Sequence, residues 1–595
     1  MVSETPAILP GWDLGGRYLS IFYDWHGHGT ACASAIAGRG VVVPASVAPK
    51  DSLFARVVKP QPGMARDAIV VGVSGLLAGT EIGLLWAAGF DIAPDGTIRY
   101  SGKPRAKIIS NSWAVLPIYE ALTQLQGAIA FAPARVEGLD YIAILENMLS
   151  TPGLLDPSYP GVLIVQAAGN GGPGYGTVVT PAAAHRILTV GASTSYAYVK
   201  DIRGYGSATA DDIAFFSARG PTPLGWVKPD VVNVGWASWT AAPIWAGGFD
   251  LFGGTSYATP LTAGVAALIY QVLPDADPQL VKQIIMSTAD NIGYDVYSMG
   301  AGRVNAFKAV SLALELAGRE SRAKVKPLIA YSVDAEKYYL EKVYQQWVWN
   351  AKSIIELMLN LIYIALEGKA KLKFKPYSVE PNMVKQYSLY IPDIEPGSTR
   401  ETSFTIYNPT SKTAKLDVGV YWEKLVLDYE YNVTLQPVNP NITYTILVVP
   451  VDKLVDIDLL KVVFTVSYEI FDREHDYEPD YRFFLRLFGW KDVNGNGKVE
   501  IDELKYAGFS FQLSNQLVLA VSKPWRKLGD CDYLIISVTG IAINRTSEEI
   551  PARIRLLGYE IDSKAKWVSV TPTKTVLDPR SSKTFKVVVS VPKDA

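Results

Sequence analysis

Hydrophobic residues follow two different patterns along the chain. Up to about residue 318, short apolar runs rich in β-branched residues alternate with segments of small residues. Runs that are apolar without alternation are typical of parallel strands buried on both faces. Four such runs predict strands of this kind: 53–58, 107–113, 161–169 and 186–193. Segments 259–273 and 277–289 predict helices, the second capped by Asp277.

Beyond the first half, hydrophobic and polar residues alternate over short stretches that turn residues separate. A period of two is typical of strands with one buried face. We therefore expect an antiparallel β-sandwich domain over 375–530 and a second over 531–595, which ends without an obvious final strand. We expect a helical insertion or linker over residues 319–374. The predicted fold class is thus α/β over residues 1–318, with a parallel sheet flanked by helices, followed by antiparallel β-sandwich domains.

Composition narrows the range of partners. The 595 residues include 56 basic and 58 acidic side chains, for a net charge of -2. This balance gives no basic surface for nucleic acid or an anionic membrane, so we expect neither as a partner. The apolar stretches 68–89 and 354–366 contain charged or amide residues, and the second is too short to span a bilayer. We interpret the first as a buried core segment and the second as an amphipathic helix, and we expect no transmembrane segment.

The remaining features of the composition bear on the kind of organism that the protein comes from and on its cellular compartment. Only two cysteines occur, Cys32 and Cys531, too few for a disulfide framework. Few Cys and Met residues beside abundant Tyr and Pro are typical of proteins from thermophiles. The N-terminal residues lack the basic and then apolar order of a signal peptide.

Candidate chemistry begins in the segment DWHGHGTACASAIAG, residues 24–38, which contains His26 and His28. A metal-binding H-x-H pair and the base of a hydrolase are two interpretations of these histidines. A metal site of the H-x-H-x-D-H type needs Asp and His where Thr30 and Ala31 stand. That mismatch argues against the metal site.

Two downstream segments favour the hydrolase. GGTSYATP places Ser256 at a Gly-Gly-Thr turn that opens a helix. The glycines allow a tight turn, and the N–H groups of a helix N-terminus stabilise an oxyanion. In VQAAGNGGPG, a buried strand ends in a glycine loop that presents Asn170. The side-chain amide of Asn170 can donate a second hydrogen bond to the same oxyanion.

Together these motifs resemble those of the subtilisin-like serine proteases, the subtilase or peptidase S8 family. HGTACASAIAG resembles the family's histidine box, AAGN its oxyanion box and GGTSYATP its serine box. Segments 215–222, 228–235 and 299–310 match further family segments, all in the family order over residues 18–318. The resemblance implies a subtilisin-like parallel sheet flanked by helices. It also implies an enzyme that hydrolyses peptide bonds in protein or peptide substrates.

The resemblance further implies roles for individual residues. His28, in the His-Gly-Thr motif, would be the general base, and Ser256 the nucleophile that forms the acyl-enzyme. Asn170 would lie in the oxyanion hole, and His26 would be a loop residue near the cleft. Five residues match the strands that line the primary specificity pocket and pair with the substrate backbone: Ser112, Trp113, Ala114, Ala168 and Gly169. Backbone pairing of this kind implies broad specificity.

The sequence departs from the family pattern at the triad acid. A subtilisin-like triad runs Asp, His, Ser in chain order, with the aspartate at the end of the first core strand. Only Asp13 and Asp24 precede His28. Asp13 stands among Pro and Gly residues, and Asp24 lies close to His28, where family members often carry an acidic loop residue. We therefore expect that the segment with the triad aspartate and the signal peptide is missing, and that a separate N-terminal fragment is a partner. The alternative is an inactive pseudo-protease with a binding or structural role at the cell surface.

A second motif lies in the C-terminal half. DVNGNGKVEIDE, residues 492–503, fits the twelve-residue EF-hand-type calcium loop. The oxygen ligands would come from Asp492, Asn494, Asn496, the Lys498 carbonyl, Glu500 and Glu503. The alternative is an Asn-Gly turn in a β-hairpin. Because a strand precedes the loop, we expect a structural calcium ion. This loop and the N-x-T sequons at Asn432, Asn441 and Asn544 favour an extracellular or cell-surface location.

Overall fold

The computed structural model describes residues 24, 26–40, 62–73, 80–92, 98–114, 141–172, 174–194, 212–214, 216–222, 225–236, 238–319, 328–331, 391, 394–451, 457–471, 480–512, 515–543, 545–562 and 566–594. No helix in these ranges is long and apolar enough to cross a membrane. The predicted strand 53–58 and the predicted helix 354–366 lie outside them.

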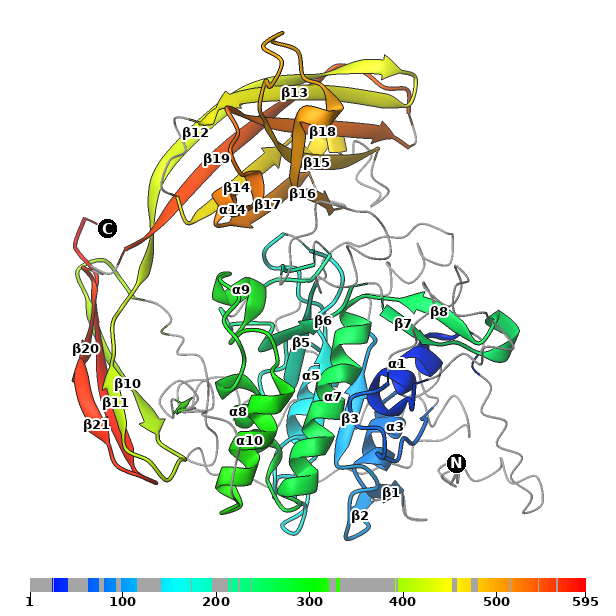
Figure 1. Cartoon of the computed structure of the whole chain (residues 1–595), viewed down its shortest axis with the longest axis vertical. Coiled ribbons are helices and arrows are strands. Elements are labelled where there is room, and N and C mark those ends of the chain that lie inside the picture. The colour runs from blue at the N-terminus through cyan, green and yellow to red at the C-terminus, as the bar shows by residue number, and fades with distance from the viewer. Residues whose placement is uncertain are drawn as a thin grey trace.

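A four-stranded parallel sheet forms the centre of the first half (Figure 1). Its strands lie in the order β3 (Ile108–Asn111), β4 (Leu163–Ala167), β5 (Leu188–Ser193) and β6 (Val231–Val234). Every residue of β4 and β5 is buried, which explains why their sequences are mainly apolar. The three predicted strands that fall within the described residues are confirmed.

Helices cover both faces of this sheet. Leu163 and Val165 of β4 pack with α7 (Thr255–Val272), α8 (Pro278–Ser287) and α10 (Ala306–Leu316). Ile164 points the other way, into a cluster with α3 (Thr80–Ala87) and α5 (Tyr141–Leu149). The predicted cap of α8 is confirmed, because Asp277 Oδ1 accepts hydrogen bonds from the N–H groups of Gln279 and Leu280 at 2.7 and 3.1 Å.

Smaller elements surround this core. They are α1 (His28–Ala37), β1 (Phe90–Ile92), β2 (Ile98–Tyr100), β7 (Ser238–Ala241), β8 (Phe249–Phe252) and α9 (Val296–Met299). Helix α1 packs against α7 and against the β7–β8 hairpin. The expectation that all of 68–89 is buried is wrong at its start, because Ile69 is 93% exposed whereas α3 is buried.

The second half contains a sheet of eight antiparallel strands. They are β12 (Trp422–Asn439), β13 (Ile442–Pro450), β14 (Leu459–Thr465), β15 (Tyr481–Trp490), β16 (Leu504–Gln512), β17 (Gln516–Ser522), β18 (Tyr533–Ala542) and β19 (Ile550–Asp562). Their order is β16-β15-β18-β13-β12-β19-β14-β17. The two edge strands β16 and β17 also contact each other, so the sheet curls into a near-barrel around one hydrophobic core.

The two consecutive β-sandwich domains that the sequence suggested are therefore not observed. Strands β18 and β19 lie beyond residue 530, yet they insert between strands from before it. Alternating residues reveal strands, but the partners of those strands depend on contacts between distant parts of the chain.

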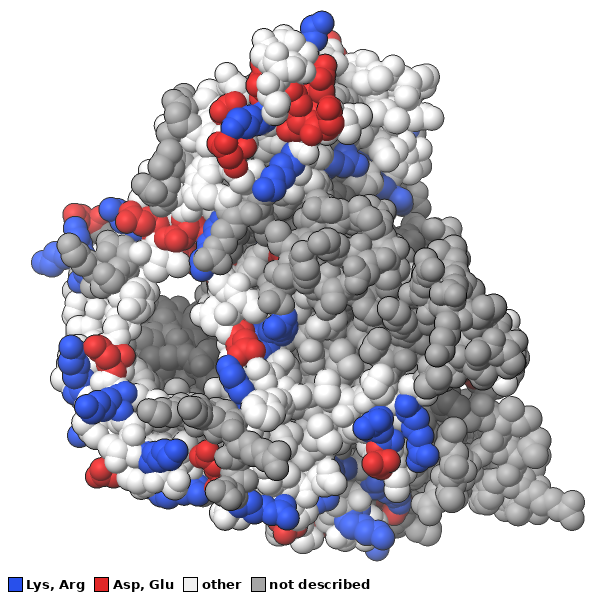
Figure 2. All heavy atoms as spheres, viewed as in Figure 1, with Lys and Arg blue, Asp and Glu red and all other residues white. Residues whose placement is uncertain are grey.

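A second β unit, which we call the small β unit, consists of strands that precede and follow the eight-stranded sheet in the sequence (Figure 1). Strands β9 (Ile329–Tyr331), β10 (Thr399–Tyr407), β20 (Val568–Thr571) and β22 (Ser582–Ser590) form one sheet, and β11 (Ala414–Asp417) pairs with β21 (Lys574–Leu577). The two sheets share a core of Ile406, Ala414, Leu577 and Phe585. Strand β9 falls within 319–374, so the described part of this predicted helical linker is a strand. Figure 2 shows basic and acidic side chains interspersed over this unit.

Candidate active site

His28 is the first residue of α1, and Asp24 caps this helix. The Asp24 carboxylate accepts hydrogen bonds from the backbone N–H groups of His26 (3.1 Å), Gly27 (2.8 Å) and Thr30 (2.8 Å), and from Thr30 Oγ1 (2.8 Å). Burial tends to raise the pKa of Asp24, but these hydrogen bonds outweigh it and lower the pKa from 3.8 to about 2. Both carboxylate oxygens are thus engaged with the helix start, and neither hydrogen-bonds to the His28 ring.

The His28 ring is partly buried, and its neighbours include Cys32, Phe252 and His26. Its Nδ1 atom is 3.7 Å from Cys32 Sγ, and the ring meets Phe252 edge to face at 5.1 Å. Burial lowers the pKa of His28 below 6.5, and repulsion from His26 lowers it further. At neutral pH the ring therefore has the unprotonated nitrogen that a general base needs. No carboxylate in the described part of the chain hydrogen-bonds to this ring, and Asp13 lies outside that part.

Ser256 is the second residue of α7, directly after a sharp turn at Gly254, where φ is 103°. Its hydroxyl donates to the Ser112 carbonyl at 3.4 Å, and the Ser112 hydroxyl donates to the Ser256 carbonyl at 3.0 Å. Cys32 Sγ lies 3.5 Å from the same Ser256 carbonyl. Since Cys32 also touches His28, the starts of α1 and α7 meet at one place. The Ser256 hydroxyl itself points toward Ser112 rather than His28.

Asn170 follows β4 and faces the turn before Ser256. Its Oδ1 atom accepts hydrogen bonds from Thr255 N–H at 2.9 Å and from Thr255 Oγ1 at 3.0 Å. Its Nδ2 atom lies 3.3 Å from the point that a Cβ on Gly254 would occupy. The acceptor side of the amide is therefore anchored to Thr255, and the amide lies beside the turn that precedes Ser256. Gly254 leaves room for this approach and adopts a φ that other residues rarely adopt.

Comparison with known proteins identifies the fold around these residues. Residues 17–306 match the family model described as the subtilase family. This part of the chain belongs to the subtilase family, and we call it the subtilase domain. Pyrolysin from Pyrococcus furiosus is 36% identical over 174 residues, which are 25% of this chain and 12% of pyrolysin. Serine protease AprX from Bacillus subtilis is 34% identical over 163 residues, 25% of this chain and 35% of AprX. The chain thus spans a minor part of the length of these curated relatives.

Solved structures add little to this comparison. The protease domain of PatA is 25% identical and covers 48% of this chain and 80% of its own, with a TM-score of 0.28. A TM-score this low carries no argument about the fold.

The five predicted substrate-binding residues of the subtilase domain differ in how many of their backbone N–H and C=O groups are already hydrogen-bonded within the protein. Ser112, Trp113 and Ala114 follow β3, which among the described residues pairs with β4 alone, and all three are at least partly exposed. The Trp113 carbonyl accepts a hydrogen bond from Gln166 Nε2 at 2.5 Å. In contrast, the N–H and C=O groups of Ala168 and Gly169 all bond within the protein, at 2.9 to 3.3 Å. Backbone pairing between substrate and these two residues, as the sequence suggested, is therefore not available, although they can still line a pocket.

The predicted calcium loop follows β15, outside the subtilase domain, and is exposed. Asp492 and Glu503, at its two ends, accept hydrogen bonds from backbone N–H groups of the loop at 2.8 to 3.3 Å. The side-chain amides of Asn494 and Asn496 donate to Glu500 at 2.9 and 3.1 Å. Within the described ranges, no three His, Cys, Asp or Glu residues are grouped as metal ligands. Calcium binding stays a prediction.

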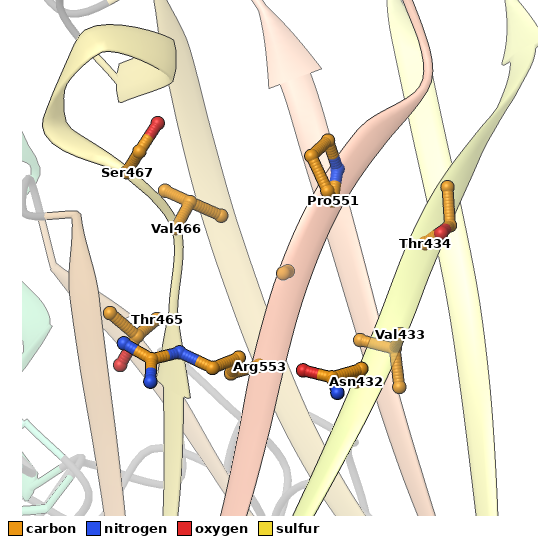
Figure 3. Close-up of a pocket in the computed structure, with 9 residues that line it drawn as sticks. Asn432, Val433, Thr434, Thr465, Val466, Ser467, Pro551 and Arg553 are labelled. Atoms are coloured by element: carbon orange, nitrogen blue, oxygen red, sulfur yellow. The ribbon is translucent and has the colours of Figure 1, made fainter.

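A pocket of about 450 Å³ lies on the outer face of the eight-stranded sheet (Figure 3). Asn432, Arg553 and Thr465 are cross-strand neighbours on β12, β19 and β14 and all line it. The lining contains no histidine and no carboxylate, so it offers no base for a nucleophile. We assign this pocket no part in the chemistry of the subtilase domain.

Proposed function

We propose that the chain is a serine endopeptidase in which Ser256 is the nucleophile and His28 the general base. The observation that carries the proposal is the meeting of two helix starts with the Asn170 loop. Cys32 Sγ lies 3.7 Å from His28 Nδ1 and 3.5 Å from the Ser256 carbonyl, and the Asn170 side chain hydrogen-bonds to Thr255, the residue before Ser256. A nucleophile, a base and an oxyanion donor from separate segments are the parts that acyl transfer requires.

The proposed reaction uses these groups in sequence. The His28 nitrogen that does not face Cys32 takes the proton of Ser256 Oγ as the oxygen attacks the scissile carbonyl. The Asn170 amide and the Ser256 backbone N–H stabilise the oxyanion of the tetrahedral intermediate. His28 then protonates the leaving amine, and water hydrolyses the acyl-enzyme by the same steps. The hydroxyl of Ser256 has to rotate away from Ser112 for the first step.

We assign substrate backbone pairing to residues 112–114 alone. These residues follow β3, which lies at an edge of the sheet in the described part of the chain, and the Ser112 carbonyl lies 3.4 Å from Ser256 Oγ. An edge strand binds an extended peptide mainly through main-chain hydrogen bonds. The substrates would accordingly be unfolded segments of proteins, or peptides, of varied sequence.

Labelling with a fluorophosphonate probe tests the proposal. We expect purified wild-type protein to be labelled at Ser256, and Ser256→Ala and His28→Ala to lose the label. Asn170→Leu should lower kcat by about 10²- to 10³-fold, the usual effect of removing one oxyanion donor. A folded wild-type protein that does not react would contradict the peptidase and favour the alternative of a pseudo-protease that binds without cleaving.

We also propose that the loop 492–503 binds one structural Ca²⁺ through the oxygens of Asp492, Asn494, Asn496, the Lys498 carbonyl, Glu500 and Glu503. The sequence spacing supports this proposal, and the abundance of calcium outside cells suits a site with so few charges. Calcium should raise the melting temperature of chelator-treated protein, since a ligand stabilises the state that it binds. Asp492→Asn should abolish this shift, whereas Asp417→Asn, an exposed residue of the small β unit, should leave it unchanged. An equal shift in Asp492→Asn would rule out this loop.

A further inference from the structure

Two paired residues of the eight-stranded sheet contact two paired residues of the subtilase domain. Tyr175 and Arg219 of the subtilase domain form an isolated parallel bridge with each other. Lys461 on β14 and Ala520 on β17 are direct cross-strand partners. Lys461 Nζ lies over the Tyr175 ring at 4.8 Å, and Arg219 Nη1 donates to the Ala520 carbonyl at 3.4 Å. Neighbouring residues on one side thus contact neighbouring residues on the other.

The surroundings hold this contact in a fixed geometry. Lys461 lies between two rings, because its Nζ is also 4.5 Å from the Tyr559 ring of β19. The Tyr175 hydroxyl donates to Asp295 Oδ2 at 3.0 Å, and Arg219 is only 3% exposed. Lys461 is partly buried, and a cation between aromatic faces that has lost part of its water interacts more strongly than a fully exposed one. In Figure 1, β14 and β17 lie on the side of their sheet nearest to α9.

The contact reaches the segment that carries Asn170, which we call the oxyanion loop, residues 169–172 and 174–177. Tyr175 lies within this loop. Residues 216–220, which include Arg219, run beside it and join it through four backbone hydrogen bonds of 2.8 to 3.1 Å. These bonds run from Ala218 to Gly169, Gly172 to Phe216, Gly176 to Gly220 and Thr177 to Arg219. The oxyanion loop and residues 216–220 beside it therefore both contact the eight-stranded sheet.

We propose that the eight-stranded sheet positions the oxyanion loop, with Lys461, Tyr175 and Arg219 as positioning residues. This inference rests on the proposed function, because it matters for catalysis only if Asn170 is an oxyanion donor. The loop is rich in glycine and has few side chains of its own to fix it. An external attachment supplies the rigidity that a preorganised hydrogen-bond donor needs.

Hydrogen exchange followed by mass spectrometry tests the attachment without relying on activity. We expect Lys461→Met to speed exchange in the oxyanion loop about 3- to 30-fold, the range for losing one partly buried cation–π contact. The control is Lys586→Met, which removes an exposed ion pair with Glu401 in the small β unit and should leave the loop unchanged. Unchanged exchange in folded Lys461→Met would overturn the proposal. Tyr175→Leu, from the other side of the contact, provides the same test if Lys461→Met does not fold.

Kinetics then test the consequence for catalysis. We expect Lys461→Met to lower kcat about 3- to 10-fold with little change in KM, because the oxyanion forms only in the transition state. Lys461→Arg, which keeps a cation between the rings, should restore kcat. A rise in KM alone, or equal loss in Lys586→Met, would contradict a positioning role. Inactive wild-type protein would refute the peptidase, and the exchange measurement would still decide whether the sheet holds the loop.

Discussion

Replacing Asp24 by Asn separates two roles for the one described aspartate that precedes His28. As observed, the carboxylate caps α1 by accepting hydrogen bonds from three backbone N–H groups and from the Thr30 hydroxyl. Asn keeps one carbonyl acceptor, which can serve either the His26 and Gly27 side or the Thr30 side, and loses the other acceptor. We therefore expect Asp24→Asn to fold and to keep kcat within about tenfold of wild type, because α1 still presents His28.

The cost in stability follows from the pKa of Asp24. Burial acts to raise it, but the hydrogen bonds to Thr30, Gly27 and His26 lower it from 3.8 to about 2 in the folded state. Each pKa unit corresponds to about 1.4 kcal/mol, and the partial exposure of the carboxylate reduces the net effect to about 1 kcal/mol. A depressed pKa stabilises the fold above the unfolded value of 3.8. This contribution is lost as the pH falls toward 2.

Thermal melting at pH 7 and pH 3, with kcat on a peptide substrate, provides the measurement. Asp24→Asn should melt a few degrees below wild type at pH 7, and the gap should narrow at pH 3. Asp24→Ala, which removes every acceptor, is the control and should melt lower still. If Asp24 were instead the triad acid, its amide would reduce kcat by roughly 10⁴-fold in a normally folded protein. That result would refute the capping role.

Three further predictions concern groups that are partly or fully buried, or that lie beside such a group. Burial and then the charge of His26 lower the pKa of His28, so His26→Gln should move the acidic limb of kcat/KM to higher pH in a pH–rate profile. Asp230 bonds to Lys228 at 2.8 Å and to a second buried lysine at 3.0 Å. Asp230→Asn should lower the free energy of unfolding by about 3–5 kcal/mol in urea titrations, and an unchanged midpoint would contradict this. Burial raises the pKa of the Cys32 thiol to about 11, so mass spectrometry should find it unmodified by iodoacetamide at pH 8 until the protein is unfolded.

Several features could be predicted from the sequence because they depend on neighbouring residues. Mainly apolar runs predicted β4 and β5, and Asp277 predicted the start of α8. The sequence also predicted the Gly-Gly-Thr turn before Ser256, since only glycine readily adopts the φ of 103° found at Gly254. In each case, burial, a helix cap or a backbone dihedral angle restricts which residue types can stand at a few neighbouring positions.

Only the tertiary structure decided how distant segments meet. The alternating pattern predicted strands beyond residue 375, but not that β12 pairs with β19 across the whole C-terminal half. No local pattern showed that the backbone of Gly169 is already bonded within the protein, or that Lys461 reaches Tyr175. Strand register and contacts between domains depend on residues far apart in the chain. Their free energy arises only when the fold brings them together, so no short stretch of sequence encodes them.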